Sequence, residues 1–182
     1  MPTAVFHILF PLIILSLYRN HFLTKEKRAL FSLSYVFIGG LAGVIPDIDF
    51  IPVWILSFFS DNSYFLHGKL SHSLFILPVL FFVGFLIFSK VEYKFKFRHD
   101  ELKFSIILFL LFFGSVIHII LDYFLGGGLF AFYPFINEGV GFNPALVFPE
   151  SLQPWFIPSL EGIFLVCWLI YLFYYKKIKD FS

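Results

Sequence analysis

Five long runs of apolar residues divide the chain, with polar clusters between them. The runs cover residues 4–18, 29–46, 73–89, 104–125 and 156–175. A membrane-spanning helix needs about 20 consecutive apolar residues, so the pattern predicts about five transmembrane helices. A further apolar stretch, Phe50 to Ser60, is too short to cross and predicts an interfacial or re-entrant helix. We therefore expect an all-α polytopic membrane bundle with short interfacial helices, forming one integral membrane domain over residues 1–182.

Composition supports this class. Hydrophobic residues make up 59% of the 182 residues and charged residues only 14%, with a mean hydropathy of +0.88. A soluble domain carries about 25% charged residues. The net charge of +1 offers no basic surface for nucleic acid. Cys167 is the only cysteine, which excludes an intrachain disulfide.

The basic residues predict the orientation of the helices. Every Lys and Arg except Lys69 falls in segments 19–28, 90–103 or 176–179. With five spans these segments lie on one side, which the positive-inside rule makes cytoplasmic. No Lys or Arg precedes Arg19, so the first run lacks the basic start of a signal peptide and predicts a retained helix. We expect a multi-pass protein of the cytoplasmic (inner) membrane, with its N-terminus outside and its C-terminus in the cytoplasm.

Two other patterns concern packing. Gly39 and Gly43 have the small-residue spacing that lets membrane helices approach closely, and we expect them to serve packing alone. The segment 126–155 is the longest loop and is rich in aromatic residues. Since Tyr and Trp favour the membrane interface, we expect this segment to lie along the outer surface.

Most histidines and several carboxylates fall near the outer ends of the predicted helices. They are His7, Asp47, Asp49, His67, His72, His118, Asp122 and Glu161. An ionisable group inside a spanning helix costs about 2.5–3.5 kcal/mol on the mildest scale, and a bound metal would offset that cost. His118 and Asp122 are four residues apart and so share one helix face. Imidazole and carboxylate together suit zinc or a similar divalent ion.

Each of these residues also has a purely structural interpretation. Asp47 and Asp49 can simply end a helix at the aqueous interface, and His67 and His72 can be interfacial polar residues. His118 and Asp122 can form a hydrogen-bonded pair between helices. Remaining alternatives are a core histidine at His7, an interface residue or a partner of a ligating histidine at Glu161, and a helix N-cap at Ser71. Convergence on one side favours the metal site over all of these together.

At these positions the sequence resembles the YdjM-type inner-membrane proteins, a family described as LexA-binding and as metal-dependent hydrolases. The family pattern is an early His, then Pro-Asp-x-Asp, His-Arg-Gly-x-Thr-His-Ser, Gly-x3-His-x3-Asp and a later Pro-Phe. Here the order is kept by His7, Pro46 to Asp49, His67 to Ser73, Gly114 to Asp122, and Pro134-Phe135. The chain departs from the pattern at Phe50, where the family often has His, at Gly68-Lys69 in place of Arg-Gly, and at Ser71 in place of Thr.

The family is in turn similar to the zinc-dependent phospholipase C and P1-nuclease group, which holds zinc ions with His and Asp, including a His-x3-Asp pair. His118 and Asp122 match that pair. The resemblance implies hydrolysis of phosphoesters.

Together these observations predict a membrane-embedded metal-dependent hydrolase acting at the outer face. A divalent ion, expected to be zinc, would be held by Asp49, His72, His118 and Asp122. His7 and His67 would hold a second ion or steady the substrate, and Asp47 would be the general base. His118 lies roughly 10 Å below the outer end of its helix at 1.5 Å per residue, near the level of lipid headgroups, so we expect a lipid or amphiphilic phosphoester as substrate.

Two other functions remain open. A transporter or ion-binding membrane protein would also carry polar residues within its helices, although near the membrane midplane rather than toward one side. A non-catalytic membrane partner of a regulator would fit the LexA-binding description, but its cytoplasmic surface would be only two short loops and a tail.

Overall fold

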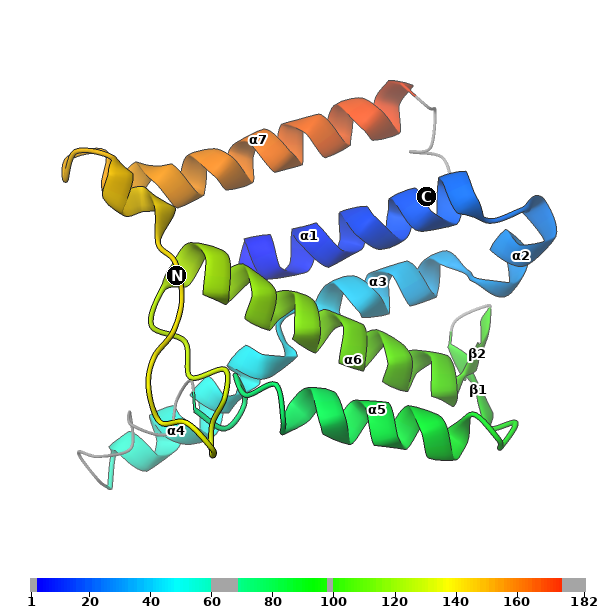
Figure 1. Cartoon of the computed structure of the whole chain (residues 1–182). Coiled ribbons are helices and arrows are strands. Elements are labelled where there is room, and N and C mark those ends of the chain that lie inside the picture. Colours follow the sequence, from blue (N-terminus) through cyan, green and yellow to red (C-terminus); the bar gives the residue numbers. More distant parts are fainter. Residues whose placement is uncertain (1–2, 60–68, 98–99, 175–182) are drawn as a thin grey trace.

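The computed structural model describes residues 3–59, 69–97 and 100–174, and these are mostly helical (Figure 1). The longer helices are α1 (Ala4–Leu17), α3 (Leu33–Ala42), α5 (Leu77–Phe88), α6 (Phe104–Leu121) and α7 (Gln153–Tyr174). The shorter elements are α2 (Lys25–Leu30), α4 (Phe50–Ser57), β1 (Lys94–Phe97), β2 (Asp100–Lys103) and the 3-10 turns Ile45–Asp49 and Pro144–Val147. Wider π-helical turns extend α1 over Tyr18–Phe22 and α6 over Asp122–Gly126.

In the part of the chain that the structure describes, three continuous helical segments are long and apolar enough to cross a membrane: Ala4–Phe22, Phe104–Gly126 and Gln153–Tyr174. A fourth span results if Leu33–Ala42 and Ile45–Ile55, which meet at 52°, count as one broken helix. The prediction of a helical membrane protein is therefore confirmed, with three to four of the five expected spans reaching full length.

The third predicted span is shorter than its apolar run. The run 73–89 predicted a helix of spanning length, but α5 has only 12 residues and begins at Leu77. Pro78 occupies the first turn of α5, where its missing N–H costs no hydrogen bond. The expected N-cap at Ser71 is consequently wrong, because turns separate Ser71 from the start of α5.

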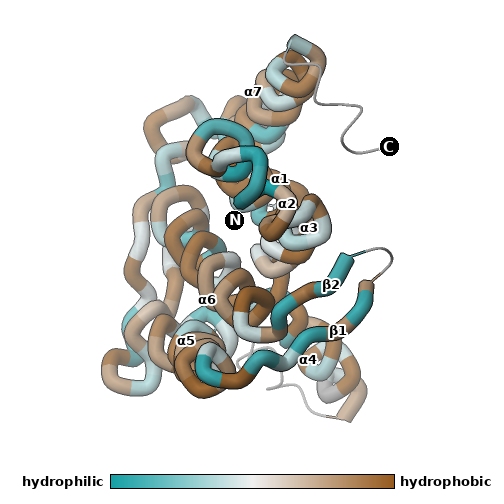
Figure 2. The backbone as a smooth tube through the Cα atoms, turned by 90° about the vertical axis from the view of Figure 1, so that its right-hand side faces the viewer, coloured by the Kyte–Doolittle hydropathy of each residue, from teal (hydrophilic) through white to brown (hydrophobic). Residues whose placement is uncertain are grey.

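The predicted loop 90–103 contains two strands that hydropathy did not indicate. Strands β1 and β2 pair antiparallel, with Lys94 opposite Lys103 and Phe97 opposite Asp100. Figure 2 shows hydrophilic residues concentrated on this hairpin and on the turn that carries α2, while the helices are largely hydrophobic. The basic loops 19–28 and 90–103 thus lie at the same end of the bundle, as their charges predicted.

Helices α1, α3 and α6 pack closely because glycines line their contacts. A side chain on Gly39 would meet Leu15 of α1 and Leu110 of α6, and one on Gly43 would meet the backbone of His7. Gly114 of α6 lies in the same way against Ala42 of α3. The close approach predicted for Gly39 and Gly43 is confirmed, and the backbone around His7 is held tightly by it.

Helix α7 stands farther from the bundle than the others, and only 6% of its apolar window is buried. Phe164 of α7 contacts Phe6 of α1, with their ring centroids 5.4 Å apart. Two polar contacts connect α7 to the rest of the chain: Glu161 accepts hydrogen bonds from Thr3, and the Tyr171 hydroxyl lies 3.0 Å from His21 Nε2.

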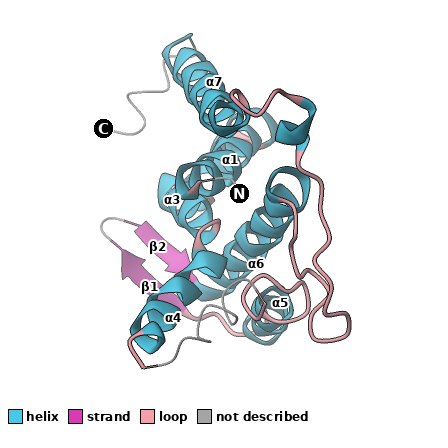
Figure 3. Cartoon of the chain, turned by 90° about the vertical axis from the view of Figure 1, so that its left-hand side faces the viewer, coloured by secondary structure: helices cyan, strands magenta, loops and turns pink. Residues whose placement is uncertain are grey.

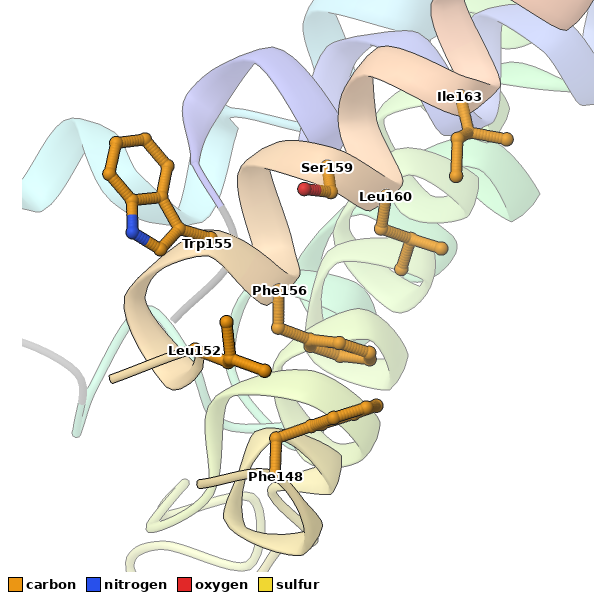
Figure 4. A pocket seen from close by; sticks show the side chains of 7 residues that line it. All are labelled: Phe148, Leu152, Trp155, Phe156, Ser159, Leu160 and Ile163. Atoms are coloured by element: carbon orange, nitrogen blue, oxygen red, sulfur yellow. The ribbon is translucent and has the colours of Figure 1, made fainter. Parts of the chain in front are cut away.

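An aromatic hollow of about 280 Å³ marks the start of α7 (Figure 4). Phe148 and Phe156 line it with their ring centroids 5.2 Å apart, and Trp155 beside them is 67% exposed. Exposed aromatic residues at one end of a spanning helix are typical of a membrane interface.

Candidate metal centre

Four segments far apart in the sequence meet at the end of the bundle opposite the hairpin (Figures 1 and 3). They are the first turns of α1, the 3-10 turn Ile45–Asp49 that follows α3, the turns before α5, and the last turn of α6. The first three carry His7, Asp47 and His72 in that order, and the end of α6 carries both His118 and Asp122. These five side chains form what we call the His/Asp cluster.

Asp122 connects the three histidines of the cluster. Its Oδ1 lies 3.3 Å from His7 Nε2, and its Oδ2 lies 3.5 Å from His72 Nε2 and 3.2 Å from His118 Nε2. The rings of His7 and His118 stack with their centroids 3.8 Å apart. One carboxylate therefore faces three imidazole nitrogens.

Asp47 approaches the cluster from the other side. Its Oδ1 is 3.2 Å from His72 Nε2 and 3.6 Å from His118 Nε2. The histidines and Asp122 are at most 2% exposed, whereas the Asp47 side chain is 32% exposed. Asp47 is thus the member of the cluster that solvent or a ligand can reach.

The partner of His118 Nδ1 fixes which nitrogen of that ring carries the proton. Nδ1 lies 2.7 Å from the carbonyl oxygen of Gly43. A carbonyl only accepts hydrogen bonds, so Nδ1 donates. In the neutral ring Nε2 then presents a lone pair to Asp122 and Asp47.

The orientation of the His72 ring and the position of its proton are fixed by a chain of two hydrogen bonds. Ser71 donates its hydroxyl hydrogen to Asp49, and the Ser71 oxygen lies 2.9 Å from His72 Nδ1. Since the hydroxyl has only one hydrogen, its oxygen accepts from Nδ1–H. The neutral His72 ring therefore also presents a lone pair at Nε2.

These two lone pairs face each other. His72 Nε2 and His118 Nε2 are 3.0 Å apart, and both point at carboxylate oxygens. Two more atoms of the cluster, His7 Nδ1 and Asp122 Oδ1, are buried without a hydrogen bond. The crowded electron pairs of the two Nε2 atoms and the neighbouring carboxylate oxygens repel one another unless a cation, either a proton or a metal ion, lies between them. Imidazole nitrogens held by a backbone carbonyl or a carboxylate relay are also the usual arrangement around a metal.

Among the described residues, two sets of three have ligand atoms close enough to hold one ion. They are His7, His118 and Asp122, and Asp47, His72 and His118, each with its atoms within 4.8 Å of one another. The residues present thus fit a divalent metal, in donor type as well as in spacing.

Asp49 and Glu161, which the sequence also singled out, lie outside these two sets. Asp49 contacts Ser71. Glu161 contacts Thr3 rather than a histidine. His67 falls outside the described residues.

Two residues with a role at the cluster were not expected to have one. Ser71 was interpreted as a helix cap and Gly43 as packing alone, yet each fixes an imidazole. The signal for Ser71 was its position beside His72. The role of Gly43 could not be predicted, because every residue has a backbone carbonyl and the sequence does not show which one a side chain will contact.

Two cavities of the described residues lie near the cluster. One of about 320 Å³ is lined by aliphatic side chains together with Asp49 and Ser71. The other, about 370 Å³, has Thr3, Asn143 and Gln153 in its lining, and Thr3 precedes His7 by about one helical turn. The first cavity is mostly apolar and the second is more polar.

Comparison with known proteins gave a family match. Residues 1–179 match the protein family described as YdjM inner membrane protein. No curated protein and no solved structure matches the chain significantly.

Proposed function

The chain belongs to the YdjM inner membrane protein family, and we propose that it is a membrane-embedded hydrolase that works with one divalent metal ion, zinc by preference. The observation that supports this proposal most strongly is the pair of facing Nε2 atoms, 3.0 Å apart, on His72 and His118. Both are lone-pair donors by virtue of their Nδ1 partners, and both lie beside carboxylates.

One ion accounts for the whole cluster. His118 belongs to both possible ligand sets, and it offers a single ligand atom because Gly43 occupies its Nδ1. The two sets therefore share one ligand atom and describe one site. We assign the ion to His7, His72, His118 and Asp122, and we assign Asp49 the role of orienting His72 through Ser71.

The bound ion would supply Lewis acidity and make water a nucleophile near neutral pH. The exposed carboxylate of Asp47 lies next to this position and is our general base. In the hydrolysis of a phosphoester, the water oxygen bonds to phosphorus while the ester P–O bond breaks. Asp47 accepts one proton from the water and returns it to the leaving oxygen, which leaves an alcohol and a phosphate.

We propose a lipid or another amphiphilic phosphoester as the substrate. The apolar cavity beside Ser71 suits a hydrocarbon chain, and the polar cavity beside Thr3 suits a headgroup. In the proposed topology α5 is a fifth, shortened crossing, the cluster faces outward and the basic loops face the cytoplasm. The aromatic hollow at the start of α7 would then lie at the outer interface.

Metal content tests the proposal directly. We expect purified full-length protein to carry about one equivalent of zinc or another divalent ion by plasma mass spectrometry. His118→Ala and Asp122→Ala should lose it while keeping their helical circular dichroism. His21→Ala, which removes a histidine from the π-helical turn Tyr18–Phe22 at the far end of α1 from His7, should retain it.

Hydrolysis is measured next on the same proteins, with a panel of phosphoester lipids in mixed micelles. Wild type should release product and the metal-free variants should not. Folded wild-type protein that stays metal-free after reconstitution would refute the proposal, because protons on the imidazoles would then hold the cluster together.

A further inference from the structure

A cavity of about 600 Å³ lies at the end of the bundle away from the His/Asp cluster, between α1, α2 and α6. It is walled by Ile14, Leu15, Tyr18, Leu23, Lys27, Leu30, Phe31, Ile106, Phe109, Leu110 and Phe113. Nine of these side chains are purely apolar, and the two with polar groups are Tyr18 and Lys27. A mostly apolar cavity with a few polar groups is the usual form of a small-ligand site.

The cavity has a polar entrance and an apolar depth. Its wall on α6 runs from Ile106 to Phe113, which covers about the first 10 Å of that helix at 1.5 Å per residue. Helix α6 starts at Phe104, directly after the basic hairpin. Lys27 lies on α2, in the hydrophilic turn at this same end. The cavity is therefore polar near the membrane surface and apolar toward the middle of the membrane, which matches the headgroup and acyl chains of a lipid.

Lys27 is also available for an anionic ligand. The neighbouring arginines are engaged with backbone carbonyls: Arg19 donates to Phe31, and Arg28 donates to Leu23 and Asn20. On the hairpin, Lys94 and Lys103 lie within 4.0 Å of glutamates. Within the described ranges no carboxylate lies within ion-pair distance of the Lys27 amine.

We propose that this cavity is a binding site for an anionic glycerophospholipid, with one acyl chain between α1 and α6 and the phosphate at Lys27 and the Tyr18 hydroxyl. Basic residues at the mouth of a cavity between membrane helices are suited to anionic headgroups. The segment from Leu23 to the end of α2 distinguishes the site from ordinary lipid contact, because Leu23 and Leu30 line the cavity on a third side. The site is independent of the proposed hydrolase activity.

Lipid retention tests the site. Full-length protein is reconstituted with equal amounts of dioleoyl phosphatidylglycerol and dioleoyl phosphatidylcholine, and native mass spectrometry counts the lipids that stay bound. One lysine near the surface should favour the anionic lipid about fivefold, and Lys27→Gln should reduce this ratio to about one. Lys25→Gln is the matched control: it removes the same charge from the same helix but does not line the cavity.

A second variant tests the apolar part. Ile14→Trp fills the cavity and should reduce retention of both lipids, while phosphatidylglycerol with a diazirine in its acyl chain should crosslink to α1 and α6 in wild type. The proposal is overturned if wild type retains neither lipid or shows no preference. An equal effect of Lys25→Gln and Lys27→Gln would overturn it too, since that result indicates diffuse surface charge. Metal content should be unchanged in all these variants.

Discussion

The Nδ1 atom of His118 lies 2.7 Å from the carbonyl oxygen of Gly43, so α6 is joined to the end of α3 through a ligand candidate. The same glycine lies against the backbone of His7 on α1. Gly43 therefore holds three helices in register at the His/Asp cluster, and its missing side chain is what allows them to meet.

Replacing Gly43 with alanine should damage the site and the fold together. The added methyl would overlap the His7 backbone, which cannot move as a flexible side chain can. Overpacking of this kind costs about 1–3 kcal/mol, so Gly43→Ala should lower both the thermal midpoint in detergent and the metal content. Gly162→Ala is the control, because a methyl there meets nothing within 4 Å. Equal midpoints for the two variants would contradict the close packing at Gly43.

Ser71 should matter for metal affinity rather than for folding. Ser71→Ala removes the acceptor that orients His72, and loss of such a partner typically weakens a metal site about 10–100-fold. Competition with a chromogenic chelator measures this change. Ser71→Thr keeps the hydroxyl and should restore affinity, and Ser89→Ala removes a serine far from the cluster. Unchanged affinity in Ser71→Ala would show that the relay from Asp49 does not orient the ring.

Asp47 and Asp49 should respond differently to the same substitution. Asp47→Asn removes the proposed base and should lower kcat by about 10²–10⁴ while most of the metal stays bound. Asp49→Asn should instead resemble Ser71→Ala and weaken metal binding. Metal titration beside steady-state kinetics separates the two effects, and identical phenotypes would argue against the roles assigned here.

Glu161 should prove to be structural. Its Oε1 accepts from both the backbone N–H and the hydroxyl of Thr3. Glu161→Ala should loosen α7 and raise its susceptibility to proteolysis, with metal content unaffected. Glu161→Gln keeps an acceptor oxygen and should behave like wild type. If Glu161→Ala released the metal, the carboxylate would have a part in the cluster that its contacts do not indicate.

Hydropathy predicted the helices well where a single apolar run forms a single helix. Residues 104–125 and 156–175 correspond closely to α6 with its π turn and to α7. Hydropathy missed the features that depend on backbone geometry within a run. The predicted second span ends at Pro46 and the predicted short helix begins at Phe50, so a break after α3 was expected, but its angle of 52° was not. The late start of α5 was missed because residues 74–76 are apolar like the helix that follows them.

The candidate site was predicted in outline because burial of charge near one membrane face is visible in sequence. The different positions of Asp47 and Asp49 relative to the histidines were not predicted. These residues lie two apart on a 3-10 turn of about three residues per turn, so their side chains point in different directions. Which of them faces the histidines depends on the rotation of that turn, which hydropathy does not indicate.

The cluster draws its members from the start of α1, the turn after α3, the turns before α5 and the end of α6, which all lie on the same side of the bundle. During biosynthesis each of these helices has to be inserted in a particular direction for this to happen. A helix inserted upside down would deliver its imidazole or carboxylate to the opposite leaflet. If the cluster binds metal as proposed, the metal content of a preparation would therefore also report the fraction of molecules in which every helix was inserted in the correct direction.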